Sequence, residues 1–321
     1  MTLINGIQPL VSVCVVTYNQ EKYIRKCLES VVTQHVNFPI EIIVGDDAST
    51  DLTSMIVKEF SVEHTGLVRV IRHAKNIGPT ANVLSTYSAA KGKYIAHLDG
   101  DDIMLPGKLQ AQLEILEANP DCIACVHDVI LINPSDELIQ DHWKNNKEGK
   151  KDVHYLLDNL PFFAHSSKFF RAESLQGFTG DGGGELIDCT LHYIQAKRGF
   201  FYYINSPLGG YRLLTGLTSA TGAINPVIIR RVCEVYEKAL VELPEKNRTE
   251  KAYSKALLEF AYQSAVLDNR EDFRKYIKRS VEVAKISVLQ LAMYLMYFVP
   301  GLACRVAVLR SSFRPGGRYR R

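Results

Sequence analysis

The chain has 321 residues, of which 46% are hydrophobic and 23% charged, a balance that supports a full core and excludes a predominantly disordered chain. Its 38 basic and 35 acidic residues leave a net charge of +3, which gives no electrostatic reason to expect nucleic acid as a partner. The 21 glycines and 12 prolines follow no period, so a collagen-like chain is excluded as well.

Cysteine usage and the first residues bear on the compartment. The seven cysteines are an odd and scattered set, which predicts free thiols in a reducing compartment rather than a disulfide framework. Residues 1–8 contain neither a basic region nor a long apolar run, so no signal peptide is expected. We therefore expect a cytoplasmic protein.

The first hundred residues alternate between strand-like and helix-like segments. The strand-like segments are apolar and β-branched, and the helix-like segments carry apolar residues at helical spacing. The expected strands cover residues 10–17, 40–45, 67–72 and 94–98, and the expected helices cover 21–33, 50–61 and 79–90. This order predicts an α/β fold with a doubly wound, mostly parallel sheet and helices on both faces.

The pattern changes further along the chain. We expect a helix over 106–119, strands over 122–132 and 200–204, a turn at 206–207, and a loop or a pair of short turns over 133–152. From residue 225 onward long helical patterns dominate. We therefore expect an α/β domain over 1–222 and a helical C-terminal region over 223–321.

Polar clusters follow three of the expected strands, at residues 18–20, 46–49 and 99–102. Because ligands of such sheets bind beyond the carboxyl ends of the strands, these clusters should face one crevice. Asp99 and Asp101, separated by one residue, can direct oxygens at one divalent cation, which would neutralise charge on a departing diphosphate. The alternative is a solvated turn, because Asp-x-Asp also occurs by chance.

Three ordered motifs carry a family resemblance: Val11-Ser-Val-Cys-Val-Val-Thr-Tyr-Asn19, Glu41-Ile-Ile-Val-Gly-Asp-Asp-Ala-Ser-Thr-Asp51 and Tyr94-Ile-Ala-His-Leu-Asp-Gly-Asp-Asp-Ile-Met-Leu-Pro106. Together they resemble a family 2 glycosyltransferase, strongly over residues 10–130 and more weakly to about 220. The resemblance implies the GT-A fold and a nucleotide-diphosphate sugar donor. It also implies a nucleotide-sugar-binding half over 1–102 and an acceptor half over 103–222.

The resemblance assigns the donor pocket residue by residue. Thr17, Tyr18 and Asn19 would line the base and ribose pocket, and Asp47 would accept a hydrogen bond from the nucleobase, which suits an acceptor-only carboxylate. Asp46 would hold the loop.

The next two motifs complete the donor side. Asn76 belongs to a segment that in the family reads Asn-x-Gly followed by Ala-Arg-Asn. This chain has Thr80-Ala-Asn82 instead, so the family's arginine is missing. By the same resemblance, Asp99 would lie near the ribose or sugar and, with Asp101, would hold the divalent cation, Mn or Mg.

An inverting member of the family also needs a carboxylate that deprotonates the acceptor hydroxyl. The resemblance places it at the start of a helix that ends in Lys/Arg-Gly, and this position is occupied by Asp188. Ile187 stands where the family commonly has Glu. The alternatives are that Asp188 only caps the helix, or that Glu185 or Asp181 is the base.

Two further residues match family positions near the donor. His165 would touch a phosphate or a hydroxyl, with a structural histidine as the equal alternative. Arg212 would contact the diphosphate bidentately, with an ordinary salt bridge as the alternative. Residues 218–219 would belong to a segment that closes over the donor.

Two other signals carry no chemistry. Cys122-x-x-Cys125 lies inside an apolar strand pattern without a second ligand pair, so we expect core cysteines rather than a zinc or redox site. The glycines at 182–184 are not followed by Lys-Ser/Thr, so they form no phosphate-binding P-loop.

The C-terminal residues suggest a surface role. Residues 286–304 carry no charge, and arginines follow without any acidic residue after Glu282. An apolar helix with a basic tail is typical of peripheral contact with an anionic membrane leaflet, here through 286–321 at the inner face of the cell membrane. The alternatives are packing on the core and a homodimer contact.

These expectations combine into one function. The chain would be a metal-dependent, inverting hexosyl- or N-acetylhexosaminyltransferase that moves a sugar, uridine-linked by preference, to a glycan or lipid-linked acceptor in cell-surface polysaccharide assembly. One alternative is an inactive, membrane-associated module that binds nucleotide sugars. A nicotinamide-dependent dehydrogenase is the lower alternative, because no Gly-x-Gly-x-x-Gly follows the first strand.

Overall fold

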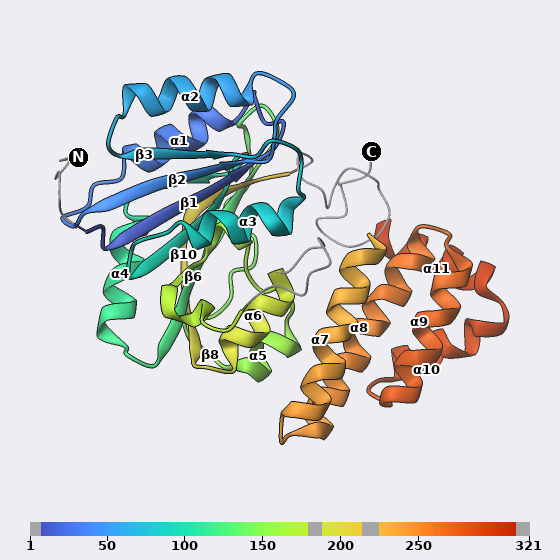
Figure 1. The fold of residues 1–321 in the computed structure, drawn as a ribbon. Helices are drawn as coiled ribbons and strands as arrows, with labels where there is room; N and C mark the ends of the chain where they lie inside the picture. Colours follow the sequence, from blue (N-terminus) through green and yellow to red (C-terminus); the bar gives the residue numbers. More distant parts are fainter. Residues whose placement is uncertain (1–7, 179–187, 214–224, 313–321) are drawn as a thin grey trace. The chain divides into compact units, whose positions relative to one another are not determined.

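The computed structural model describes residues 8–178, 188–213 and 225–312 (Figure 1). Two compact units divide the chain: residues 1–153 with 161–217, and residues 154–160 with 218–321. The first unit carries a mixed sheet and the second is helical.

The amino-terminal part of the first unit is a parallel β/α arrangement, as predicted. Its strands pair in the order β3-β2-β1-β4 and are connected by three helices. The strands are β1 (Val11–Thr17), β2 (Ile40–Asp46), β3 (Val68–Arg72) and β4 (Tyr94–Asp99), and the helices are α1 (Ile24–Val32), α2 (Thr53–Glu63) and α3 (Pro79–Ser88).

Helices cover both faces of this parallel part (Figure 1). Val13 and Val15 of β1 pack into the same buried cluster as Leu28 of α1, whereas the Sγ atom of Cys14 lies 3.7 Å from the carbonyl oxygen of Thr86 in α3. Successive side chains of a strand point to opposite faces. Burial on both faces therefore explains why these strands read as continuous apolar runs.

The rest of the sheet is antiparallel in part. β9 (Phe169–Arg171) inserts between β4 and β6 (Cys122–Ile132) and runs antiparallel to both, while β10 (Phe200–Arg212) lies parallel to β6 and antiparallel to β5 (Ile103–Met104). The predicted turn at 206–207 is wrong, because β10 continues through register shifts on either side of Pro207. Proline cannot donate to the ladder, and a bulge accommodates it.

The predicted loop over 133–152 contains two short strands. β7 (Leu138–Gln140) pairs with β6, and β8 (Gly149–Lys151) pairs with β10. The other elements of the first unit are α4 (Lys108–Ala118), η1 (His165–Ser167), η2 (Ala172–Leu175) and α6 (Asp188–Ala196). Cys122 and Cys125 are free and buried, as expected for core cysteines.

The second unit is built from helices. They are α5 (Val153–Asp158), which begins one residue before the unit, α7 (Pro226–Glu242), α8 (Lys246–Val266), α9 (Arg270–Val283), α10 (Val288–Leu295) and α11 (Pro300–Ser312). The apolar segment 286–304 is interrupted between α10 and α11, where the short 3-10 helix η3 (Met296–Phe298) lies. Pro300 then begins α11, because proline has no backbone N–H with which to continue a preceding helix. Among the described residues, none of the helices combines the length and the apolar character that crossing a bilayer requires.

Candidate active site

The loop after β2 is held by its two aspartates. Asp46 accepts hydrogen bonds from the backbone N–H and the hydroxyl of Ser49 at 3.0 and 2.6 Å, and it also accepts one from Ser54. Asp47 is buried and accepts the backbone N–H groups of Ile77 and Gly78 at 2.7 and 3.0 Å. Asp47 therefore ties two loops together, and its contact with a nucleobase stays a prediction.

The predicted base pocket after β1 divides into buried and exposed groups. The hydroxyl of Thr17 is buried and donates to Oε1 of Gln20 at 2.7 Å, whereas Tyr18 leaves 45% of its surface exposed. Asn19 has a positive φ of 52°, and its Oδ1 atom accepts the backbone N–H of Thr50 at 2.8 Å. Tyr18 and Asn19 are thus the exposed members of this trio, and Thr17 is the buried one.

Asn76 lies in the loop that Asp47 fixes. Its Oδ1 atom accepts the backbone N–H of Gly78 at 3.2 Å. Gly78 has a φ of 90°, a left-handed conformation that glycine adopts without strain, and it precedes Pro79 at the start of α3. Asn76 therefore shapes the loop, and its role toward a donor stays a prediction.

Asp99 sits at the end of β4 in a dense hydrogen-bond network. Its Oδ1 atom lies 3.1 Å from Nε2 of His97, and its Oδ2 atom accepts the hydroxyl of Ser166 at 3.0 Å. Burial alone would raise the pKa of Asp99, but the charge and hydrogen bond of His97 and the bond from Ser166 outweigh it and lower the pKa below 3.8. Asp99 therefore stays ionised.

His165 links this network to Asp188. The rings of His165 and His97 stack with their centroids 3.8 Å apart, and Nδ1 of His165 lies 3.3 Å from Oδ1 of Asp188. The hydroxyl of Tyr87 reaches both histidines, at 2.9 Å from Nδ1 of His97 and 3.5 Å from Nε2 of His165. The structure thus brings together three predicted site residues from β4, η1 and α6.

His97 and Tyr87 received no role from the sequence. His97 stands two residues before Asp99 in a strand, so both side chains must share a face of the sheet, and this spacing could have identified it. No comparable signal marks Tyr87, because its proximity depends on how α3 packs.

Asp188 is the first residue of α6, as predicted, and 42% of its side chain is exposed. Desolvation by the surrounding protein, followed by the charge of Asp99, raises the pKa of Asp188 from 3.8 to about 6, although His97 and Lys168 act in the opposite direction. A carboxylate with a pKa near 6 suits a general base. The alternative bases Glu185 and Asp181 lie outside the described residues, as does the segment 218–219.

A buried lysine belongs to the same region. Burial lowers the pKa of Lys168 to about 7, and its Nζ atom lies 4.7 Å above the ring centre of Phe170. This atom has no hydrogen-bond partner among the described residues. Lys168 therefore supplies a positive potential toward Asp188 that partly counteracts its raised pKa.

The Asp-x-Asp loop concentrates negative charge. Asp101 and Asp102 are both buried, and burial together with the charges of Asp101 and Asp99 raises the pKa of Asp102 well above its usual value. One oxygen of Asp102, Oδ2, lacks a partner among the described residues. An orphaned carboxylate oxygen beside two other carboxylates is a donor set that fits a divalent cation.

This loop and the lysine that follows it are closely packed. Gly100 has no space for a side chain, because a Cβ atom would lie 2.5 Å from Oε1 of Gln20 and 2.9 Å from Cβ of Thr17. The buried Nζ atom of Lys108 donates to the carbonyl oxygen of Ser166 at 2.5 Å, and burial lowers its pKa to about 7. The loop is therefore packed tightly against the end of β1.

A second set of possible metal ligands lies beside the first. Ligand atoms of His97, Asp99 and His165 lie within 4.8 Å of one another. Imidazole nitrogens suit first-row transition metals, whereas Mg²⁺ prefers oxygen ligands such as those of Asp99 and Asp101.

Arg212 holds the Asp-x-Asp loop in place. Its Nε atom donates to the carbonyl oxygen of Asp101 at 2.8 Å, its backbone N–H donates to Oδ1 of Asp102 at 2.8 Å, and its guanidinium pairs with Asp136 at 2.6 Å. The guanidinium also lies 4.6 Å from the ring centre of Tyr23. The salt bridge allowed as an alternative is therefore present, and contact with a phosphate stays a prediction.

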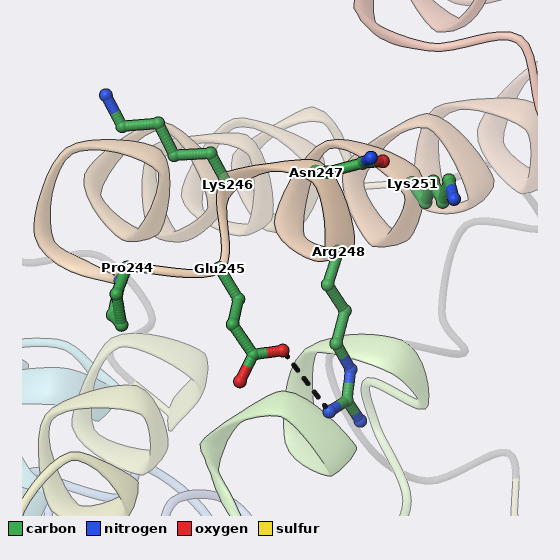
Figure 2. Close-up of a pocket in the computed structure, with 6 residues that line it drawn as sticks. All are labelled: Pro244, Glu245, Lys246, Asn247, Arg248 and Lys251. Atoms are coloured by element: carbon green, nitrogen blue, oxygen red, sulfur yellow. Dashed lines mark ion pairs between the residues drawn. The ribbon is translucent and has the colours of Figure 1, made fainter.

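One hollow of the second unit contains none of these residues. It is lined by Pro244, Glu245, Lys246, Asn247, Arg248 and Lys251 (Figure 2). Figure 2 shows Glu245 and Arg248 facing each other, and their ion pair measures 3.8 Å. Glu245 also pairs with His154 of α5, and Arg248 pairs with Asp158 of α5. Glu245 and Arg248 are thus engaged in ion pairs, and because the hollow contains no predicted site residue it is not a candidate active site.

Known proteins resemble this chain in sequence and fold. Residues 12–178 match the model of glycosyl transferase family 2. An uncharacterized protein of Mycobacterium tuberculosis, Rv1520, is 41% identical over 122 residues, which cover 38% of this chain and 35% of the relative. The match therefore spans about a third of that relative's length.

Two solved structures share the fold. TarS of S. aureus, in complex with UDP-GlcNAc, superposes with a TM-score of 0.65 at 18% identity over 97% of this chain and 93% of that chain. The mannosyltransferase PcManGT of Pyrobaculum calidifontis, in complex with GDP-Man and Mn²⁺, superposes with a TM-score of 0.58 at 18% identity over 95% and 88%. The GT-A fold implied by the motifs is confirmed.

Proposed function

The chain belongs to glycosyl transferase family 2, and from that membership we propose that it transfers a sugar from a nucleotide-diphosphate donor to an acceptor hydroxyl, with Asp188 as the general base. The observation that carries the proposal is the chain of contacts from Asp99 through His97 and His165 to Asp188. It joins the Asp-x-Asp loop to a carboxylate at the start of a helix, within one network.

The proposed chemistry follows from the charges. Asp188 takes the proton of the acceptor hydroxyl, which attacks C1 of the donor sugar from the face opposite the nucleotide and inverts its configuration. His165, whose pKa burial holds well below 6.5, is a neutral imidazole whose Nδ1 atom lies 3.3 Å from Asp188 without neutralising it. Asp188 therefore keeps the negative charge that a base needs.

We propose that Asp101 and Asp99 hold a divalent cation, Mn or Mg. The clustered carboxylates and the unpartnered oxygen of Asp102 support this assignment. When bound, the cation would stabilise the negative charge of the departing nucleoside diphosphate. On the protein side, Arg212 orients this loop, because its backbone N–H donates to Oδ1 of Asp102 and its Nε atom donates to the carbonyl oxygen of Asp101.

The proposed donor is uridine-linked, and the proposed acceptor is a glycan or a lipid-linked glycan of a cell-surface polysaccharide. The UDP-GlcNAc bound by TarS supports a uridine donor, while the GDP-Man and Mn²⁺ bound by PcManGT support both a nucleotide-sugar donor and a cation. A hexose or an N-acetylhexosamine is the transferred sugar.

The test is a donor panel measured with the whole chain. UDP-GlcNAc, UDP-glucose and GDP-mannose are added with and without Mn²⁺, and both the melting temperature and the release of nucleoside diphosphate are recorded. We expect a UDP-sugar to raise the melting temperature in the presence of Mn²⁺, because a ligand at about 100 times its Kd stabilises a protein by about 2.7 kcal/mol. Slow hydrolysis of the same donor should accompany this rise in melting temperature.

Two other outcomes contradict the proposal. Stabilisation without hydrolysis or transfer would favour the inactive binding module. No response to any nucleotide sugar would exclude the donor site altogether.

The pH profile provides a further prediction. Because the pKa of Asp188 is about 6 and the base must be ionised, kcat/KM should fall about tenfold per pH unit below pH 6 and level off above it. The measurement is the initial rate of diphosphate release between pH 5 and pH 8. Below pH 6 the slope should correspond to a change in rate of about tenfold per pH unit. The residual rate of Asp188→Asn is the control and should lack this slope, and an equal slope in the variant would assign the titration to another group.

A further inference from the structure

Two helices of the second unit turn apolar side chains toward solvent. These residues recur every three or four positions along each helix: Val288, Leu291 and Leu295 on α10, and Leu302, Val306 and Leu309 on α11. More than half of the large apolar side chains that are exposed in the described part of the chain lie within 288–309. A helix on a protein surface normally directs polar residues outward, so this apolar stripe is unusual.

The opposite faces of both helices are already packed. Gln290 of α10 is buried and donates to the hydroxyls of Ser254 and Ser280 at 2.8 Å each, while Ala303 and Ala307 of α11 are buried. α10 contacts α9, and α11 contacts α8 and α9. Because polar bonds and small residues fix which face points inward, the exposure of the apolar stripe is a property of the fold.

Positive charge accompanies the apolar stripe. No acidic residue follows Glu282, whereas the stretch after it contains Lys285 and six arginines. Two of these arginines, Arg305 and Arg310, are exposed on α11, where Arg305 lies one turn from both Leu302 and Leu309. The apolar stripe is thus bordered by cations that have no acidic residues nearby in the sequence.

We propose that the apolar stripe is a docking surface for an anionic lipid bilayer. The leucines and valines enter the boundary between headgroups and acyl chains, and the arginines bind the negatively charged headgroups. A second copy of the chain fits less well, because a two-fold contact through the stripe would place the arginines of both copies in one interface to which the stretch after Glu282 adds no acidic residue. The surface belongs to the second unit and contains no residue of the catalytic network.

The test is co-sedimentation of the full chain with vesicles. One set contains phosphatidylglycerol and phosphatidylcholine in equal parts, and the other contains phosphatidylcholine alone. We expect binding to the anionic vesicles, weakened by added salt. Replacing both Arg305 and Arg310 by Gln should reduce the partition constant about 25-fold, since each arginine near such a surface contributes about fivefold. The double variant Leu295→Ser/Leu309→Ser should reduce it by about 10-fold or more.

A matched control uses exposed apolar residues elsewhere. Leu295 and Leu309 are 74% and 63% exposed, and Val241 and Val62 are 83% and 69% exposed. The double variant Val241→Ser/Val62→Ser should therefore bind vesicles like the wild type. Thermal melting and donor hydrolysis should stay unchanged in every variant, which separates this proposal from the proposed catalytic function.

Three results would overturn the proposal. The first is equal binding to both kinds of vesicle, and the second is equal loss in the control variant. The third is a dimer in sedimentation velocity without lipid that Leu295→Ser/Leu309→Ser converts to a monomer, which would identify a second copy as the occupant.

Discussion

An Asp188→Asn variant is expected to lose about 10²- to 10⁴-fold in kcat while it still binds the donor, because removal of a positioned general base costs that much. Asparagine keeps the size of the side chain but cannot take the proton. The fold should persist, because the side chain is 42% exposed and a charge in the first turn of a helix contributes only about 0.3–1 kcal/mol. The measurement is single-turnover sugar transfer together with the donor-induced melting shift.

Two further variants make this assignment specific. Glu185→Gln and Asp181→Asn alter the neighbouring carboxylates that the sequence allows as alternative bases, and both should retain transfer within a few-fold of the wild type. If Asp188→Asn turns over normally and either of these variants is inactive, the base is misassigned.

An Asp101→Ala variant is expected to lose transfer by about 10²- to 10³-fold, the effect of removing one group that stabilises charge in the transition state. It should also lose the Mn²⁺-induced rise in melting temperature, which is a readout independent of turnover. Removing one carboxylate beside Asp102 relieves repulsion, because the charge of Asp101 helps to raise the pKa of Asp102. The loss of transfer should therefore not result from unfolding.

The control for this variant is Asp121→Ala, which removes an exposed carboxylate just before β6. It should preserve both transfer and the response to Mn²⁺. An Asp101→Ala protein that keeps an unchanged Mn²⁺ response would place the cation elsewhere, with His97, Asp99 and His165 as the ligand set to test next.

Much of the sheet could be predicted because its strands are buried on both faces. An apolar run such as Val11–Thr17, followed by a helical pattern and another apolar run, leaves few topologies, and the β/α order was confirmed. The extent of β10 could not be predicted, because Pro207 indicates a turn locally. Only the pairing with β6 on both sides of the bulge keeps the chain extended.

The candidate site divides in the same way. Asp99 and Asp101 stand at the end of a strand pattern, so local order pointed to them, whereas Asp188 was assigned by its resemblance to a family position at the start of a helix. The proximity of these residues could not be found, because β9 pairs antiparallel to β4 only in the folded sheet, and η1, just before β9, then brings His165 against His97. Antiparallel pairing of a three-residue strand leaves almost no periodic signal.

The sequence by itself determined the alternation of strands and helices, the acidic loop after β4 and the charge of the C-terminal stretch, because these depend on residue type and spacing along the chain. Only the tertiary structure decided that His97 stacks on His165, that Arg212 hydrogen-bonds the acidic loop, and that apolar residues of α10 and α11 face solvent. Each of these depends on which face of an element is covered by another, and that is settled by packing between segments far apart in the chain.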